Sequence, residues 1–186
     1  MSQGHALVIG GTGMLSEVTV WLNNKGYFVS VIGRRKERYH QLMEKVESPE
    51  NISSILVDYH KTDELRQALT EAIENHGAFD RVVAWVHSSA PDVIPTLLKL
   101  QEQYHREKGF ELFHVKSSTS YFVEEETPEL PDGCTYSEIF LGFKQSSGHS
   151  RWLTHEEISE GIKDSIHHSR PQTIVGQIEP WEQRPH

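Results

Sequence analysis

A glycine-rich turn near the start of the sequence has the residue types and spacing that bind a pyrophosphate. An apolar run at 7–9 is followed by Gly10, Gly13 and Ser16 at three-residue intervals. Such a turn lets a pyrophosphate approach backbone N–H groups at the positive end of the next helix. Ser16 stands where a glycine is usual, and its small side chain still permits close packing of helix on strand. The turn therefore predicts a dinucleotide site, with an ordinary glycine turn without a ligand as the alternative.

Two arginines follow the second apolar strand, where the ribose of a dinucleotide would lie. A site for NAD usually places an acidic residue there, about 20 residues after the glycines, to bind the ribose 2′-hydroxyl. This chain has Arg34 and Arg35 instead. Two guanidinium groups suit a 2′-phosphate, and no carboxylate is present to repel it. The sequence thus favours NADP as the cofactor. The alternative is that Arg34, Arg35, Lys36 and Arg38 form only a solvated helix start.

Further polar side chains gather at the predicted carboxyl ends of two later strands. In an open α/β sheet these ends border the crevice where ligands bind. Strand alternation places His114 and Lys116 on one face and Ser117 on the other. The candidates near a reacting centre are His87, Ser88, His114, Lys116, Ser117, Ser118 and Tyr121.

The elements that must position these residues alternate between strand and helix. This alternation predicts parallel β-α-β units with right-handed crossovers. The expected fold is α/β: a doubly wound, mostly parallel sheet of seven strands in three α/β/α layers, with first strands in the order 3-2-1-4-5. We expect one domain, residues 1–186. The predicted strands are 6–10, 27–32, 52–58, 81–86, 110–115, 136–143 and 173–178, and the predicted helices are 13–25, 35–47, 62–75, 91–109 and one that begins at Thr154.

The strand at 136–143 alternates in polarity, as an edge strand or a strand of a mixed sheet would. Before it, Pro128, Pro131 and Gly133 interrupt residues 117–134, so no long helix is expected there. At Thr154 the sequence has a capping box, with Glu157 at the third helical position.

Composition narrows the possible partners and the location. The net charge of −9 argues against nucleic acid or an anionic membrane as a partner. The absence of a long apolar run or a signal-peptide pattern predicts a cytoplasmic protein. One cysteine, Cys134, excludes an internal disulfide. The 12 histidines include no His-Glu-x-x-His motif, so we expect no metal.

With these motifs the chain resembles the short-chain dehydrogenase/reductase superfamily, in its atypical branch. The resemblance covers most of the chain and is most specific in the first 90 residues. It implies a Rossmann fold and places Asp58 beside the adenine, with the backbone of Tyr59 next to it; a surface carboxylate is the alternative. The loop of His87 and Ser88 departs from the Asn-Asn-Ala-Gly pattern, which implies only a backbone role beside the ribose. The implied cofactor turn is Gly10, Gly11, Thr12, Gly13, Met14 and Leu15.

The chain departs from this family's pattern after residue 110. The family's Tyr-x-x-x-Lys pair is missing, since Tyr121 is followed at that spacing by Glu125 and Tyr136 by Phe140. We expect Ser118 to hold a substrate carbonyl and Tyr121 to donate the proton. Lys116 could lower the pKa of Tyr121. A solvated lysine and a loop tyrosine are the alternative.

Two functions stay open. The first is an NADP-dependent oxidoreductase that acts on a small carbonyl or hydroxyl compound without the usual Tyr-x-x-x-Lys pair. The second is a non-catalytic NADP(H)-binding module that senses redox state or regulates a partner. The retained serines favour the first, and the missing pair favours the second. A homo-oligomer is plausible for either.

Overall fold

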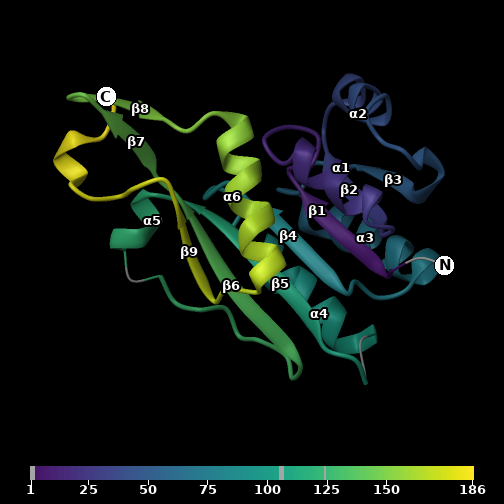
Figure 1. The fold of residues 1–186 in the computed structure, drawn as a ribbon. Helices are drawn as coiled ribbons and strands as arrows, with labels where there is room; N and C mark the ends of the chain where they lie inside the picture. Colours follow the sequence, from purple (N-terminus) through teal and green to yellow (C-terminus); the bar gives the residue numbers. More distant parts are fainter. Residues whose placement is uncertain (1–2, 105–106, 124) are drawn as a thin grey trace.

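Seven parallel strands form the central sheet, in the order β3-β2-β1-β4-β5-β6-β9 (Figure 1). The computed structural model describes residues 3–104, 107–123 and 125–186. The expected order of the first five strands and the expected seven-stranded doubly wound sheet are confirmed. The strands are β1 (His5–Ile9), β2 (Phe28–Gly33), β3 (Ile52–Leu56), β4 (Arg81–Trp85), β5 (Phe110–Ser117), β6 (Cys134–Leu141) and β9 (Gln172–Val175).

Helices cover both faces of this sheet, which gives the three α/β/α layers. One face packs against α1 (Ser16–Asn24), α2 (Lys36–Met43) and α6 (His155–His168). The other packs against α3 (Thr62–His76) and α4 (Val93–Tyr104). The helix expected over 91–109 is thus α4, and positions 105 and 106 of that prediction lie outside the described residues. Short 3-10 helices occupy Pro49–Asn51 and Trp181–Gln183.

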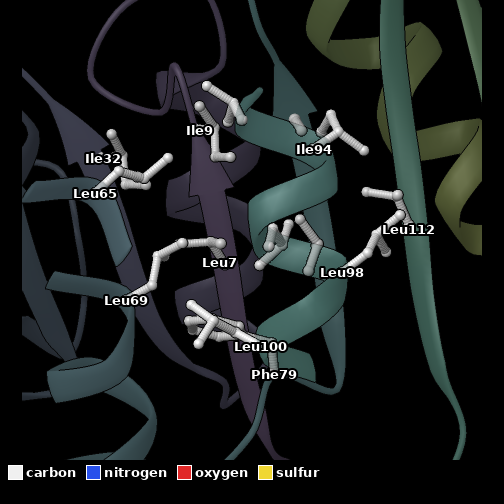
Figure 2. Packing of buried hydrophobic residues seen from close by; sticks show 14 of the residues in the cluster. Leu7, Ile9, Ile32, Leu65, Leu69, Phe79, Ile94, Leu98, Leu100 and Leu112 are labelled. Carbon is white, nitrogen blue, oxygen red and sulfur yellow. The ribbon is translucent and has the colours of Figure 1, made fainter. Parts of the chain in front are cut away.

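Alternate residues of the central strands pack into two separate hydrophobic cores, one on each face of the sheet. In β1, Leu7 and Ile9 pack toward α3 and α4, and Ala6 and Val8 pack toward α1 and α6. Figure 2 shows the first of these cores, in which leucine and isoleucine side chains of α3 and α4 close over β1. Strands buried on both faces carry the continuous apolar runs seen in the sequence. This burial fixes the central strands and so positions the loops at their carboxyl ends.

The connection from β5 to β6 contains no long helix, as predicted. Its one helix is α5 (Thr119–Phe122), and the described residues from 125 to 133 form no helix or strand. Pro128 and Pro131 lie in this stretch and cannot continue a helix. Residue 124 lies outside the described residues. The face of β5 and β6 on the side of α4 is therefore covered by irregular chain.

The expectation that the strand at 136–143 is an edge or mixed strand is wrong. That strand is β6, which lies inside the sheet and pairs in parallel with both β5 and β9. Its alternation has a different cause, because only one of its faces is covered by a helix. Ile139 and Leu141 pack under α6, whereas Tyr136 and Glu138 point to the face that lacks a long helix and stay partly exposed.

The last part of the chain adds a hairpin at the carboxyl end of the sheet. Strands β7 (Phe143–Ser146) and β8 (His149–Trp152) pair antiparallel, which the sequence did not predict. The predicted capping box is present: the Thr154 hydroxyl accepts from the Glu157 N–H at 3.1 Å, and the Glu157 carboxylate accepts from the Thr154 N–H at 3.0 Å. Among the described residues, no helix is long and apolar enough to cross a membrane.

Candidate active site

The glycine turn between β1 and α1 is held closed by its own backbone. The N–H groups of Gly13 and Leu15 both donate to the Gly10 carbonyl, each at 3.2 Å. Gly10 has a φ of 88°, which favours glycine. A Cβ on Gly11 would lie 2.6 Å from Thr19 Oγ1, so only glycine lets α1 pack this closely on the strand. The turn thus offers bare backbone at the positive end of α1, as a pyrophosphate site requires.

At the start of α1 the Ser16 N–H donates to the Gly13 carbonyl at 3.1 Å. No side chain of the described residues caps this helix, which begins at Ser16. Leu15 is fully buried in the core and its N–H already donates to the Gly10 carbonyl, and Met14 is partly buried. Thr12 lies against the end of β2: a Cβ on Gly33 would be 2.6 Å from the Thr12 hydroxyl oxygen. The carboxyl ends of β1 and β2 are therefore in contact around the turn.

Three arginines lie in the segment after β2, whose end adjoins this turn. Arg34 and Arg35 are exposed between the end of β2 and the start of α2. Arg38 extends from α2 over the turn, with its guanidinium 3.1 Å from where a Cβ on Gly13 would stand. These positive charges fit a phosphate group beyond the pyrophosphate.

The loops after β3 and β4 are tied together by a chain of hydrogen bonds. His60 Nδ1 lies 2.8 Å from Asp58 Oδ1, and His60 Nε2 lies 2.8 Å from Ser89 Oγ. Ser89 Oγ also lies 2.8 Å from His87 Nδ1, and the His87 N–H donates to the Tyr59 hydroxyl at 3.2 Å. The hydrogen bonds with His60, helped by the charge of a nearby arginine, lower the pKa of Asp58. No sequence motif pointed to His60 or Ser89, because their contact depends on how two loops meet.

An apolar cavity of about 410 Å³ opens at the carboxyl ends of β4, β5 and β6. Its walls come from these strand ends, from β8 and from the C-terminal tail. Ser118 is one of its lining residues, although it is only 5 % exposed. The main lining residues are Trp85, Ser118, Leu141, Trp152, Trp181 and Arg184.

A second cavity of about 660 Å³ lies between the start of α4 and the irregular chain at 125–129. Polar and apolar side chains share its lining, and we call it the polar cavity to distinguish it from the first. It occupies the region that the β5–β6 connection leaves without a long helix. Trp85 and Ser117 line both cavities, which therefore meet at the ends of β4 and β5. The polar cavity collects many of the candidates from the sequence, and its main polar lining residues are His87, Ser88, His114, Lys116, Ser117 and Glu125.

Lys116 is not the solvated lysine that the sequence left open. The residue is 7 % exposed, and its Nζ lies 2.8 Å from Glu125 Oε2 and 3.0 Å from Glu138 Oε2. Burial alone would lower the pKa of Lys116, but hydrogen bonds with the two carboxylates outweigh it and raise this pKa above its usual range. The same contact with Lys116 lowers the pKa of Glu125. Lys116 is thus a permanent buried cation between two acidic side chains.

Tyr121 and Ser118 have different surroundings in the structure. The Tyr121 side chain belongs to α5, is 38 % exposed and packs its ring edge-on against Phe140, with ring centroids 5.4 Å apart. Ser118 precedes α5 and lines the apolar cavity. The tyrosine that does approach Lys116 is Tyr136, which the sequence analysis considered only for the missing Tyr-x-x-x-Lys pair.

Comparison with known proteins supports the fold. No protein-family profile and no curated protein sequence matches this chain. Solved structures do match over nearly the whole chain. A short-chain dehydrogenase/reductase from Brucella melitensis has a TM-score of 0.72 at 14% identity and covers 94% of both chains.

Two further structures agree with this match. Glucose dehydrogenase from Caenorhabditis elegans has a TM-score of 0.70 at 14% identity, over 97% of this chain and 98% of that chain. ElxO, whose structure has NADP bound, has a TM-score of 0.69 at 12% identity, over 95% of this chain and 98% of that chain. At these identities the likeness defines the fold: the chain has the Rossmann fold of short-chain dehydrogenase/reductase structures.

Proposed function

We propose that this chain is an NADP-dependent oxidoreductase that acts on a small carbonyl or hydroxyl compound. The observation that carries the proposal is the glycine turn at the start of α1, with Arg38 over it and Arg34 and Arg35 exposed at the adjacent end of β2. Among the structures of this fold, ElxO has NADP bound. A bound NADPH would supply a hydride to a substrate carbonyl carbon.

The proposed cofactor contacts follow the carboxyl ends of β1 to β4. The backbone of residues 10–15 would bind the pyrophosphate, and Arg34 and Arg35 would bind the 2′-phosphate. Asp58 and the Tyr59 backbone would lie beside the adenine, and the backbone of the loop at 87–88 beside the ribose. The hydrogen bonds that connect Asp58 to this loop support their assignment to one site.

The proposed chemistry places a substrate where the two cavities meet. Ser118 would donate a hydrogen bond to the substrate carbonyl, which its position in the wall of the apolar cavity supports. Tyr121 is the proton donor that the sequence suggests, with Lys116 to lower its pKa. The structure shows Lys116 engaged by Glu125 and Glu138 instead, so an effect of Lys116 on Tyr121 would have to act over a longer range.

The cofactor proposal is tested by comparing the protein's affinity for NADPH, which carries the 2′-phosphate, with its affinity for NADH, which lacks it. A charge-assisted hydrogen bond is worth on the order of 1.5–3 kcal/mol, which is about ten- to hundredfold in affinity. We expect the protein to bind NADPH tighter than NADH by at least this factor in calorimetric titration. Arg34→Ala with Arg35→Ala should remove most of this preference and leave NADH affinity nearly unchanged.

A control with the same change in charge separates contact from long-range attraction. Arg66 and Arg170 are paired with acidic residues away from the glycine turn, so their double alanine variant should keep the preference for NADPH. Equal affinity of the unmutated protein for NADPH and NADH would refute the assignment to NADP.

The second candidate function is an NADP(H)-binding module without turnover. The observation in its favour is that, among the described residues of the β5–β6 connection, α5 is the only helix, and no Tyr-x-x-x-Lys pair can form on its four residues. NADPH binding without oxidation by any aldehyde or ketone would favour this function. Cytoplasmic location and a homo-oligomer stay predictions, which cell fractionation and light scattering would test.

A further inference from the structure

A hydrogen-bonded cluster fills the face of β5 and β6 that the short connection leaves without a helix. His114 and Lys116 come from β5, Tyr136 and Glu138 from β6, and Glu125 from the irregular chain that follows α5. The strand register brings them together, since His114 lies opposite Glu138 and Leu112 opposite Tyr136. His114 and Lys116 line the polar cavity.

The tautomer of His114 decides how protons can move within this cluster. The Lys116 ammonium stands beside the Tyr136 hydroxyl and acts to lower its pKa. His114 Nδ1 lies 2.9 Å from the same hydroxyl, and which of the two groups donates depends on which ring nitrogen carries the proton. With the proton on Nε2, Nδ1 accepts from Tyr136, and the Nε2–H is left to serve a second partner.

We propose that His114 is the catalytic residue that gives the proton to the substrate oxygen, and that Tyr136 replaces this proton through the hydrogen bond to Nδ1. The inference rests on the proposed oxidoreductase function. It assigns the proton source to the strands of the sheet, in place of a tyrosine on a helix after β5. Lys116 acts as a positioning residue, because it orients the Tyr136 hydroxyl and stands beside the phenolate that forms.

The proposed transfer balances in protons and electrons. Reduction forms a C–H bond at the carbonyl carbon by hydride transfer, and the π electron pair of C=O moves to the oxygen. That oxygen takes the proton of His114 Nε2 as the N–H bond breaks. Nδ1 takes the proton of Tyr136, and the phenolate left behind is paired with the Lys116 ammonium until solvent in the cavity returns a proton. The imidazole stays neutral at every stage, with its proton moved from one nitrogen to the other.

The electrostatics of the cluster agree with a relay through a neutral ring. Burial, with the nearby Lys116 cation, lowers the pKa of His114 to about 4. An imidazolium is thus disfavoured, and a His114 that gives up one proton must accept another. Burial raises the pKa of Tyr136 to about 12, while Lys116 acts to lower it. Tyr136 therefore keeps its proton near neutral pH and remains a stronger acid than the alcohol product.

The first test reads the tautomer and needs no turnover. Nitrogen NMR of the histidine rings in the free protein, assigned by comparison with His114→Gln, should show the His114 proton on Nε2 and a bare Nδ1. Tyr136→Phe removes the donor to Nδ1, so it should change the nitrogen shifts of this ring. A proton on Nδ1 of the unmutated protein would overturn the relay, whatever the protein catalyses.

The second test uses NADPH oxidation by a panel of aliphatic and aromatic aldehydes and ketones. General acid catalysis contributes about 10²–10⁴-fold, so His114→Gln and Tyr136→Phe should each lower kcat at least about a hundredfold, with the Kd for NADPH unchanged. Because the two residues act in one chain, the double variant should be no slower than the worse single variant. Tyr104→Phe, an exposed tyrosine at the end of α4, is the matched control and should keep full activity.

The outcomes separate this inference from the function on which it rests. Full activity of Tyr136→Phe, or a loss confined to Tyr121→Phe, overturns the relay and leaves the oxidoreductase intact. Binding of NADPH without reduction of any carbonyl overturns both. The relay also predicts two protons in motion, so kcat should fall as a curved function of the deuterium content of the solvent. A linear dependence would contradict it.

Discussion

Replacing His114 with Gln should make the stability of this protein less sensitive to acid. His114 is neutral in the fold, because burial and the Lys116 ammonium hold its pKa at about 4, below its ordinary value of 6.5. The unfolded chain therefore binds one more proton than the folded chain at pH values between these two. The stability that depends on a neutral His114 is fully present above pH 6.5 and is lost as the pH falls toward 4.

The size of this loss follows from the two pKa values. For one group that titrates at 6.5 in the unfolded chain and at about 4 in the fold, the free energy of unfolding falls by about 2 kcal/mol between pH 7 and pH 5. The fall reaches about 3 kcal/mol at pH 4 and levels off below it. His114→Gln lacks the titrating ring. Its free energy of unfolding should therefore fall by about 2 kcal/mol less than that of the unmutated protein between pH 7 and pH 5, and by about 3 kcal/mol less between pH 7 and pH 4.

Urea unfolding of both proteins at several pH values between 7 and 4 measures this difference. Titrating groups that do not interact with His114 cancel between the two proteins, including the buried His5, whose pKa is also lowered by burial. His149→Gln, an exposed histidine of the β7–β8 hairpin, should keep the pH dependence of the unmutated protein. A difference between His114→Gln and the unmutated protein that stays constant from pH 7 to pH 4 would refute the reasoning.

Two further predictions concern the elements that hold the site. Gly11→Ala should lower the free energy of unfolding by about 1–3 kcal/mol in urea titration, because its Cβ would lie 2.6 Å from Thr19 Oγ1. Gly13→Ala would meet only the end of the flexible Arg38 side chain and should lose less; an equal loss would contradict the packing argument. Thr154→Ala should cost about 0.5–2 kcal/mol in thermal unfolding, because it removes the acceptor of the Glu157 N–H. Thr154→Ser keeps this acceptor, so a similar loss in both variants would show that the cap is unimportant.

The fold was predictable because its signals are local. The apolar strands at 7–9 and 82–84 are buried on both faces and read as continuous runs. The turn at Gly10 and Gly13 marks the connection from β1 to α1. The order of the first five strands then follows from right-handed parallel crossovers. The same signals predicted the position of Arg34 and Arg35 at the end of β2.

The polar cluster was not predictable, because it depends on pairing between strands and on where a loop lies. Alternation placed His114 and Lys116 on one face of β5, and Val115 between them packs with the core on the side of α6. Nothing local placed Tyr136 and Glu138 on that same face, since this required the register of β6 on β5. The position of Glu125 required the path of a connection with no regular structure, for which sequence carries little signal.

The short β5–β6 connection and the polar cluster have one physical origin. A parallel sheet is stable when helices bury both of its faces, and apolar strand residues then meet apolar helix residues. Where irregular chain replaces the helix, it covers the strands less completely and brings polar backbone with it. Polar side chains on that face are tolerated only if they satisfy one another, since an unpaired buried cation such as Lys116 would be costly. The carboxylates of Glu125 and Glu138 meet that requirement for Lys116, and His114 Nδ1 lies within hydrogen-bond distance of the Tyr136 hydroxyl at the edge of the cavity.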